Sequence, residues 1–389
     1  MLIIVELLMG VSASVVFFAM VGYPCLLNVL DKIFKAPQNR VNDKYEPTVT
    51  FMIVAHNEEK VIGNKLENAI ILDYPKDKFE ILVASDNSTD KTNQIVTDFI
   101  ENHPEQNIRL YISKEHLGKT HAQNEAQKTV ESEILVMTDA NTIVETSAIR
   151  ELVSYFTSDD VAYVCGRLVY TNTNNDTSDS EATYWDMDLK MRDIESRMQT
   201  ITAGNGALYA CRNSEYKDYD PIQCHDSAMP FDFAIKGKKA LFNPKAVAYE
   251  KAGENNNDEF KRKVRMNRTI LSILHDGIKS LDIRKYKWFT VFYFGHRICR
   301  YSLWIMHIIF FLCSILLIPF GKKKTGLALV GLQIGGLATG IWSIKHTINN
   351  KWIRLGGYYV MTVLAQGVAA SKQISGKSSS IWSKADSTR

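Results

Sequence analysis

The sequence predicts an α/β domain flanked by transmembrane helices, one before the domain and two or three after it. Two observations lead to this prediction. Uncharged runs long enough to cross a bilayer lie near both ends of the 389-residue chain. Between them, strand-like and helix-like segments alternate within a polar stretch from residue 45 to 285, which is typical of a sheet covered by helices.

The first uncharged run extends from Leu7 to Leu30 and predicts a membrane anchor within residues 1–35. It is too long for the apolar part of a signal peptide, and Glu6 is the only charge before it. Four basic residues follow closely: Lys32, Lys35, Arg40 and Lys44. By the positive-inside rule the following domain is cytoplasmic, as expected for a multi-pass protein of the plasma membrane.

Residues 45–252 are predicted to form the α/β domain. Short apolar segments rich in β-branched residues predict strands at 47–55, 79–84, 109–112, 134–138 and 161–165. Apolar residues at helical spacing predict helices at 61–70, 95–100, 118–130, 148–156 and 184–198. Because short turns connect these segments, we expect a parallel sheet with helices on both faces.

Residues 253–301 are expected to contain a basic helix at 258–273 and further helices lying on the membrane surface. Uncharged runs at 302–320 and 325–344 predict a membrane hairpin, within a transmembrane region that extends to residue 371. A weaker run at 355–371 either crosses the membrane or lies at its surface. Gln366 and the basic residues of the tail, 372–389, favour the surface position and a cytoplasmic tail.

Composition and absent motifs exclude several classes of function. The net charge of +3 is too small to indicate nucleic-acid binding. The six cysteines form no C-x-x-C pair, and Cys224-His225 has no second pair to complete a zinc site, so we expect structural cysteines in a reducing compartment. The sequence has no G-x-x-x-x-G-K-[ST] loop and no G-x-G-x-x-G after its first strand, which argues against P-loop enzymes and dinucleotide oxidoreductases.

Polar residues follow three of the predicted strands: His56-Asn57-Glu58 the first, Asp86 the second, and Asp139-Ala140-Asn141 the fourth. The carboxyl ends of parallel strands meet at one edge of a sheet, where such sheets bind ligands. Carboxylates at this edge, with separate basic residues, suit the binding of a metal–diphosphate group and the activation of a hydroxyl.

Four segments occur in order along this region: TVTFMIVAHNEE, ILVASDNSTDKT, VMTDAN and HDSAMPFDFAIKGKKALFNPKAVAYE, followed by FKRKVRMNR. Over residues 47–270 the chain resembles the processive, membrane-bound family 2 glycosyltransferases, which include cellulose, hyaluronan and poly-N-acetylglucosamine synthases. The resemblance implies a GT-A-type nucleotide-sugar-binding domain and a divalent cation, Mg²⁺ or Mn²⁺. It also implies inverting transfer of a sugar, expected from a UDP-sugar, to a growing polysaccharide at the cytoplasmic membrane face, with coupled export.

In that family the ends of the first two strands hold the nucleotide of the donor. The resemblance implies donor contacts from five residues here: Ala55, His56, Asn57, Glu58 and Asp86. For Asp86 the alternative is an N-cap of the next helix, which is the preferred interpretation of Asp90. Lys119 resembles the family lysine beside the donor diphosphate, and the alternative is a solvated lysine at a helix start.

Asp139-Ala140-Asn141 occupies the place of the family's D-x-D motif. Asp139 is therefore implied to contact the donor and, with Asn141, to bind the metal. Asn141 departs from the second acid of the motif and leaves the metal preference open. Asp226 aligns with the general base of the family, and the preceding acid is replaced by His225. Asp232 is the competing candidate for the base.

Gly204, Asn205 and Gly206 resemble the family's acceptor-side segment, for which a plain tight turn is the alternative. Arg262 and Arg265 stand within the place of the family's Q-x-x-R-W motif and are implied to hold the donor diphosphate. The alternative is that these basic residues attract anionic lipids. Met266 replaces the tryptophan that helps to place the acceptor in long-chain synthases.

The expected partners are a nucleotide-sugar donor, a glycan or glycolipid acceptor, membrane lipids and accessory export subunits, with no nucleic acid. Two other functions stay open. A non-processive enzyme acting on a lipid or lipid-linked acceptor would keep the donor motifs but need no polymer channel. A non-catalytic subunit of a glycan export complex should have lost the base or the metal residues, so Asp139 and Asp226 argue against it.

Overall fold

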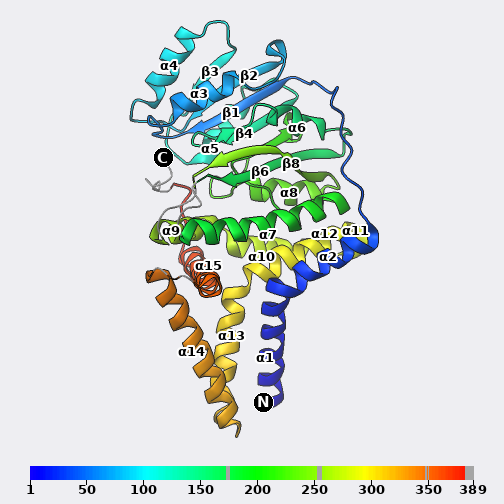
Figure 1. Ribbon diagram of the computed structural model, residues 1–389, viewed down its shortest axis with the longest axis vertical. Helices are drawn as coiled ribbons and strands as arrows, with labels where there is room; N and C mark the ends of the chain where they lie inside the picture. Colours follow the sequence, from blue (N-terminus) through cyan, green and yellow to red (C-terminus); the bar gives the residue numbers. More distant parts are fainter. Residues whose placement is uncertain (172–175, 252–255, 347, 349, 382–389) are drawn as a thin grey trace. The chain divides into compact units, whose positions relative to one another are not determined.

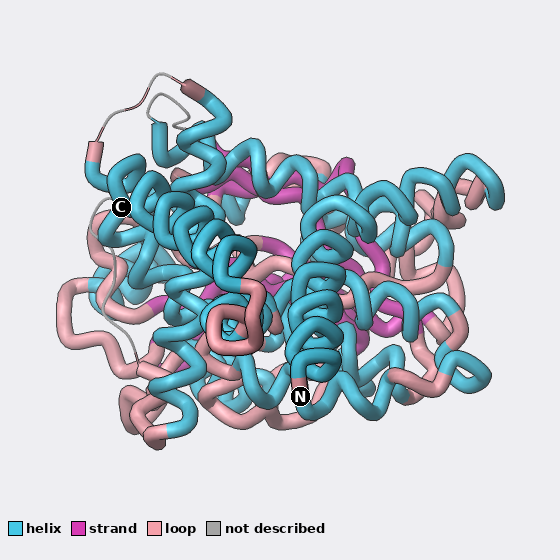
Figure 2. The backbone as a smooth tube through the Cα atoms, turned by 90° about the horizontal axis from the view of Figure 1, so that it is seen from below, coloured by secondary structure: helices cyan, strands magenta, loops and turns pink. Residues whose placement is uncertain are grey.

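The computed structural model describes residues 1–171, 176–251, 256–346, 348 and 350–381 of the chain. These residues divide into two compact units, each considered by itself below. The helical unit comprises Met1–Lys35, Thr173–Trp185 and Gly253–Ser378, and the α/β unit comprises Ala36–Asn172, Asp186–Ala252 and Ser379–Arg389. Every strand of the described chain belongs to the α/β unit (Figure 2).

The α/β unit is built on one eight-stranded sheet with the strand order β3-β2-β1-β4-β7-β6-β8-β5 (Figure 1). Its strands are β1 (Val49–Ala55), β2 (Phe79–Ser85), β3 (Ile108–Ile112), β4 (Ile134–Asp139), β5 (Ile143–Val144), β6 (Val161–Tyr170), β7 (Leu208–Arg212) and β8 (Lys239–Glu250). The five predicted strands are present, and β3, β2, β1 and β4 run parallel as expected.

The prediction of an all-parallel sheet is wrong beyond β4, because β7 lies between β4 and β6 and is antiparallel to both. β7 returns to the sheet after the long helix α7 (Asp176–Met198), so no short strand–helix–strand crossover sets its direction. β6 and β8 are parallel to each other, and the short β5 is antiparallel to β8. The sheet is therefore mixed, with its parallel half formed by the first four predicted strands.

Helices cover both faces of this sheet: α3 (Ile62–Ile70), α4 (Thr92–Asn102), α5 (Lys119–Gln127), α6 (Ala148–Ser154), α7 and α8 (His225–Ile235). Two apolar cores result, because successive residues of a strand point to opposite faces. In β1, Phe51 and Ile53 pack into one core, whereas Met52 and Val54 pack into the other. All seven residues of β1 are buried, which is why its sequence is a continuous apolar run.

The helical unit contains the apolar segments at both ends of the chain. Its helices are α1 (Leu2–Phe17), a π-helical turn (Phe18–Gly22), α2 (Tyr23–Phe34), α9 (Asn256–Met266), α10 (Ile270–Gly277), α11 (Ile283–Tyr286), α12 (Trp288–Phe292), a second π-helical turn (Tyr293–Cys299), α13 (Leu303–Leu316), α14 (Lys323–Lys345) and α15 (Lys351–Ile374). The predicted helix at 258–273 is wrong as one element, because it is divided into α9 and α10. At the break the side chain of Asn267 donates to the carbonyl of Lys263 (2.7 Å) and so competes with the helical backbone.

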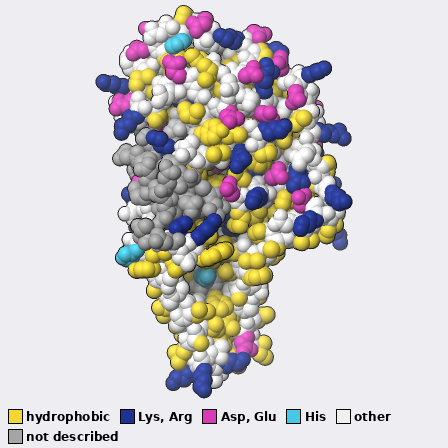
Figure 3. All heavy atoms as spheres, in the orientation of Figure 1, with side chains coloured by type: hydrophobic (Ala, Val, Ile, Leu, Met, Phe, Trp, Pro, Cys, Tyr) yellow, Lys and Arg dark blue, Asp and Glu magenta, His cyan; other side chains and the backbone are white. Residues whose placement is uncertain are grey.

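Two helical segments of the described chain are long and apolar enough to cross a membrane, Leu2–Phe34 and Lys323–Lys345. Trp288–Cys299 and Leu303–Leu316 together would make a third, with a bend of 61° between them. This agrees with the prediction of one N-terminal helix and two or three C-terminal ones. Large apolar side chains of α1, α13 and α14 are exposed, as Figure 3 shows for one face of these helices.

Candidate active site

The carboxyl ends of β1 and β2 are held together by backbone and side-chain hydrogen bonds. The amide of Asp86 donates to the carbonyl of Ala55 (2.8 Å). Asn57, which has a positive φ of 53°, accepts from the amide of Thr89 (2.7 Å) through its side-chain oxygen. The buried Glu58 donates its amide to the hydroxyl of Thr92 (2.7 Å). At this edge the backbone amides of Asp86, Glu58 and Thr89 are all engaged in hydrogen bonds within the protein.

The side chain of Asp86 is buried and accepts three hydrogen bonds from the loop before α5. The donors are His116 Nδ1 (2.7 Å) and the amides of Leu117 (3.2 Å) and Gly118 (2.9 Å). Asp86 is therefore not an N-cap of α4. Asp90 has that kind of role instead, because its carboxylate accepts from the amide of Thr92 at the start of α4 (2.9 Å).

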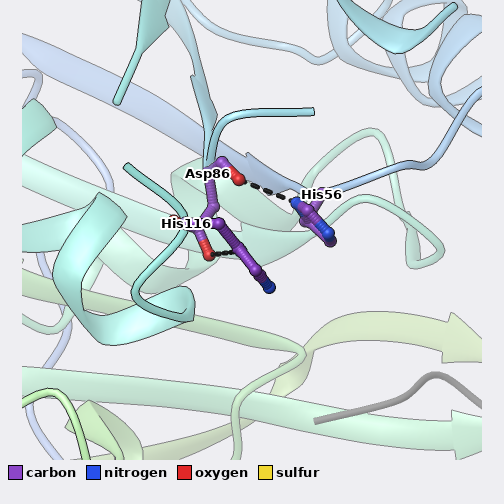
Figure 4. Close-up of side chains that lie close together, drawn as sticks. All are labelled: His56, Asp86 and His116. Carbon is purple, nitrogen blue, oxygen red and sulfur yellow. Dashed lines mark hydrogen bonds and ion pairs between the residues drawn. The ribbon is translucent and has the colours of Figure 1, made fainter. Parts of the chain in front are cut away.

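His56 and His116 stack face to face beside Asp86 (Figure 4). Their ring centroids are 3.7 Å apart and their planes differ by 8°. His56 Nδ1 lies 2.7 Å from the carbonyl oxygen of Asp86, so both rings are held by the same residue. Sequence reasoning identified His56 but missed His116, which lies in a loop and belongs to no quoted motif.

Lys119 and Asp139 meet as an ion pair at the ends of α5 and β4. The ammonium of Lys119 also lies 3.4 Å from the carbonyl oxygen of Gly206, in the segment before β7. Burial opposes the charge of Lys119, but the carboxylates of Asp139 and Asp226 raise its pKa above the ordinary value. Lys119 is therefore a fixed cation beside two carboxylates, and not a solvated lysine at a helix start.

Asp226 lies in the first turn of α8 and faces the same point as Lys119 and Asp139. A Cβ atom added to Gly206 would lie 3.4 Å from Lys119 Nζ and 3.8 Å from a carboxylate oxygen of Asp139 and of Asp226. The three charged groups thus converge on Gly206, which has no side chain to separate them. This convergence of a cation and two carboxylates is the centre of the candidate active site.

The segment Gly204–Gly206 is fixed to its surroundings by close contacts. The amide of Gly204 donates to the carbonyl of Asp226 (2.7 Å), and a Cβ atom at Gly204 would overlap the hydroxyl of Tyr163 at 1.9 Å. Asn205 is buried: its side-chain nitrogen donates to the carbonyl of Gly166 (2.6 Å), and its oxygen accepts from backbone amides. Its side chain therefore shapes this segment from within the protein, and the backbone is what faces the site.

Asp232, the competing candidate for the base, and His225, the residue before Asp226, are both engaged elsewhere. Asp232 forms an ion pair with Lys217 (2.5 Å) and, six residues along α8, lies about 9 Å further up the helix axis. His225 is buried against Asn124 and Tyr216, at 3.2 and 3.1 Å. Burial, and to a smaller extent the charge of Lys119, lower the pKa of His225 to about 3, so this ring stays neutral and is a poor proton acceptor.

Lys65 is a second residue that sequence reasoning missed. It is fully buried under the Asp139–Asn141 turn, where its ammonium donates to the hydroxyl of Thr138 (3.1 Å) and the carbonyl of Thr142 (2.7 Å). Burial lowers the pKa of Lys65 to about 7, although Asp139 opposes this shift. The sequence did contain a signal: Lys65 lies on the apolar face of the predicted helix 61–70, at helical spacing from Ile62 and Ala69.

Arg262 and Arg265 lie on α9 in the helical unit. Arg262 pairs with the fully buried carboxylate of Glu259, at 2.7 Å. Tyr358 on α15 donates to the same carboxylate (3.2 Å), so this part of α9 has a structural function within its own unit. Arg265 is half-buried on the same helix.

The residues at the Asp139–Asn141 turn are suitable for a hard divalent cation. Asp139 offers a carboxylate and Asn141 an amide oxygen, both at least partly exposed, and oxygen atoms are the ligands that Mg²⁺ and Mn²⁺ prefer. Gly206, on which the charged groups converge, lies beside the carboxylate of Asp139. A cation bound there would share Asp139 with Lys119.

This mixed sheet, with acidic residues at its carboxyl edge and a lysine fixed between them, has a GT-A-like fold. Residues 50–215 match the family described as Glycosyl transferase family 2. The recognition made from the motifs is confirmed for this part of the chain.

Curated relatives match over parts of this domain. The β-monoglucosyldiacylglycerol synthase of Synechocystis sp. is 34% identical over 112 residues, which are 29% of this chain and 23% of the relative. The poly-β-1,6-N-acetyl-D-glucosamine synthase of Staphylococcus epidermidis is 30% identical over 100 residues, 26% of this chain and 23% of the relative. The matched region thus spans about a quarter of the length of each of these relatives.

A solved structure is similar over nearly the whole chain. It is the mannosyltransferase PcManGT from Pyrobaculum calidifontis, in complex with GDP-mannose and Mn²⁺. The TM-score is 0.74, and the match covers 95% of this chain and 99% of that one, with 20% sequence identity. At this level of identity the similarity is one of fold.

Proposed function

We propose that this protein is an inverting glycosyltransferase that moves a sugar from a nucleotide-sugar to an acceptor hydroxyl at the cytoplasmic face of a membrane. The observation that carries the proposal is the convergence of Lys119, Asp139 and Asp226 around Gly206. A non-catalytic export subunit would not need this arrangement, whereas a sugar transferase needs a base, a cation and space for an acceptor.

In the proposed mechanism Asp226 accepts the proton of the acceptor hydroxyl. The acceptor oxygen then bonds to the anomeric carbon while the bond from that carbon to the diphosphate breaks. Lys119 stabilises the negative charge that develops on the departing diphosphate. A divalent cation held by Asp139 and Asn141 would supply Lewis-acid neutralisation of the same diphosphate. Arg262 and Arg265 stay predictions from the resemblance, with no role assigned to them in this step.

For the substrates, we propose a UDP-sugar donor and a growing polysaccharide as acceptor. The similarity to a poly-β-1,6-N-acetyl-D-glucosamine synthase supports a polymer. The similarity to a β-monoglucosyldiacylglycerol synthase, and Met266 in the place of the family tryptophan, favour a second candidate function, the glycosylation of a lipid. Both candidates use the same donor site.

Product analysis distinguishes the two acceptors. The purified full-length protein, in lipid vesicles with Mn²⁺, is supplied with radiolabelled UDP-glucose or UDP-N-acetylglucosamine. A polysaccharide synthase should give labelled material that remains in water and is large by gel filtration. A lipid glycosyltransferase should give a small product that is extracted into organic solvent. Absence of transfer from any nucleotide-sugar to any vesicle or glycan acceptor would contradict the proposed function.

Two contacts, one inside each unit, support the proposed topology. In the helical unit Glu6, near the start of α1, pairs with Lys322 at the tip of the α13–α14 hairpin, so both lie on one side of the membrane. This ion pair reduces the free-energy cost of placing Lys322, Lys323 and Lys324 on the outer side of the membrane, against the positive-inside rule. In the α/β unit the carbonyl oxygen of Ser380 would lie 2.7 Å from a Cβ atom on Gly118. This contact supports a tail on the same side of the membrane as the catalytic domain, and we therefore propose that α15 does not cross the membrane.

Cysteine labelling in intact cells tests this topology. With Cys25 replaced by serine, a cysteine introduced at Ser379 should react weakly with an impermeant maleimide, because the tail is cytoplasmic. A cysteine introduced at Lys323 is the matched control and should react strongly. If both positions react equally without permeabilisation, α15 crosses the membrane and the tail is outside.

A further inference from the structure

We propose that the imidazole of His116 occupies the place of the donor nucleobase until the donor displaces it, so that His116 lowers the affinity of the donor site. This inference rests on the proposed function, in which the ends of β1 and β2 hold the nucleotide. It concerns a residue outside the quoted motifs and assigns it an effect on donor affinity opposite to that of its neighbour, His56.

The first observation is that His116 makes the two contacts that a nucleobase would make at this edge. Its ring lies flat on His56, with centroids 3.7 Å apart and planes 8° from parallel, which is the geometry of a stacked base. Its Nδ1 lies 2.7 Å from a carboxylate oxygen of the buried Asp86. Figure 4 shows both interactions from one side chain.

The second observation is that Asp86 keeps its other partners when His116 leaves. The amides of Leu117 and Gly118 still hold one carboxylate oxygen each, and Oδ2, which accepts from both His116 and Gly118, can then accept one further hydrogen bond. A carboxylate accepts hydrogen bonds and donates none, so it favours a base with a ring N–H at this edge, such as the N3–H of uracil. Cytosine carries a lone pair at N3, which would face the carboxylate oxygen and be repelled by it.

The third observation is that the side chain of His116 is only partly enclosed. It lies in the loop between β3 and α5, and its side chain is 30% exposed, whereas that of Asp86 is 2% exposed. Gly118, with a φ of +103°, follows two residues later and gives this loop a backbone conformation that other residues rarely adopt. Displacement of His116 therefore costs mainly its stack on His56 and its hydrogen bond to Asp86. A bound nucleobase would replace both interactions.

A metal ion is the competing interpretation, because ligand atoms of His56, Asp86 and His116 lie within 4.8 Å of one another. Two features argue against it. Nearly parallel rings direct their nitrogen lone pairs side by side and not toward a common point. The carboxylate of Asp86 already accepts three hydrogen bonds, one of them from His116 itself.

Equilibrium binding of UDP to the full-length protein in detergent with Mn²⁺ tests the proposal. His116→Ala should lower the Kd for UDP about threefold or more, because the base no longer displaces a competing ring. His56→Ala should raise the Kd about tenfold, since the base loses its stacking surface. Glu115→Ala, an exposed neighbour, is the matched control and should stay within about twofold of wild type.

The outcomes separate this proposal from the proposed function. Binding of UDP by wild type, with weaker or unchanged binding by His116→Ala at an unchanged Tm, overturns the role of His116 and leaves the glycosyltransferase standing. Failure of wild type to bind any nucleoside diphosphate overturns the proposed function itself. Stoichiometric Zn²⁺ binding by wild type that is lost in both histidine variants would assign the cluster to a metal and overturn the proposal.

Discussion

Replacement of Asp226 by asparagine should lower kcat by roughly 10²–10⁴-fold, the usual loss when a general base is removed. Asparagine keeps the size of the side chain but cannot take the proton of the acceptor hydroxyl. The backbone carbonyl of Asp226, which accepts from Gly204, is unaffected by the change. The Kd for UDP should stay within a few fold of wild type, because the donor is held by Lys119, Asp139 and the ends of β1 and β2.

Asp232→Asn is the matched control for this experiment. Both residues are aspartates of α8, but Asp232 is paired with Lys217. Its replacement should change kcat by less than about threefold, and any effect should appear in Tm. Single-turnover transfer with purified protein measures both variants directly. Retention of more than a tenth of wild-type turnover by Asp226→Asn, together with a large loss in Asp232→Asn, would reverse the assignment.

The sequence predicted well the strands and helices whose burial is visible in their own run of apolar residues. β1, β2 and β4 are continuous apolar runs because both faces of the sheet are covered, and their parallel order follows from short crossovers. β8 was missed because Pro244 and charged residues interrupt its pattern, and the register of its pairing with β6 shifts between Cys165 and Arg167. β7 has only five residues, and its antiparallel place depends on segments far away in the chain.

The candidate site divides in the same way. Asp139 could be found because it ends a recognisable strand, and Asp226 because it lies at the start of a motif. His116 and Lys65 could not be assigned, because their roles arise from contacts across the fold: His116 with Asp86, 30 residues away, and Lys65 with Thr142, 77 residues away. Asn205, predicted from the resemblance as an acceptor-side residue, has a buried side chain that faces the protein interior, which the sequence pattern did not indicate.

Removal of divalent cations should stop transfer, with a loss of about 100-fold or more that Mn²⁺ or Mg²⁺ restores. The expectation rests on Asp139 and Asn141, whose oxygens are suitable ligands beside the proposed diphosphate position. Asp139→Asn should reproduce the loss even with saturating Mn²⁺, because it removes the one carboxylate of the turn. Full activity after exhaustive chelation, with metal content verified on the same sample, would rule out this part of the mechanism.

Asn141→Asp is the variant that tests the turn without removing a ligand. It should tighten Mn²⁺ about tenfold in direct binding, since a charged oxygen replaces a neutral one and Asp139 is already shared with Lys119. Equilibrium titration of Mn²⁺ followed by electron paramagnetic resonance gives this affinity without any transfer reaction. The buried ammonium of Lys65 beneath the turn opposes cation binding in wild type and variant alike, so it does not account for the difference. An unchanged Mn²⁺ affinity in Asn141→Asp would mean that residue 141 does not contact the cation, and Asp139 would then be the only ligand that this turn supplies.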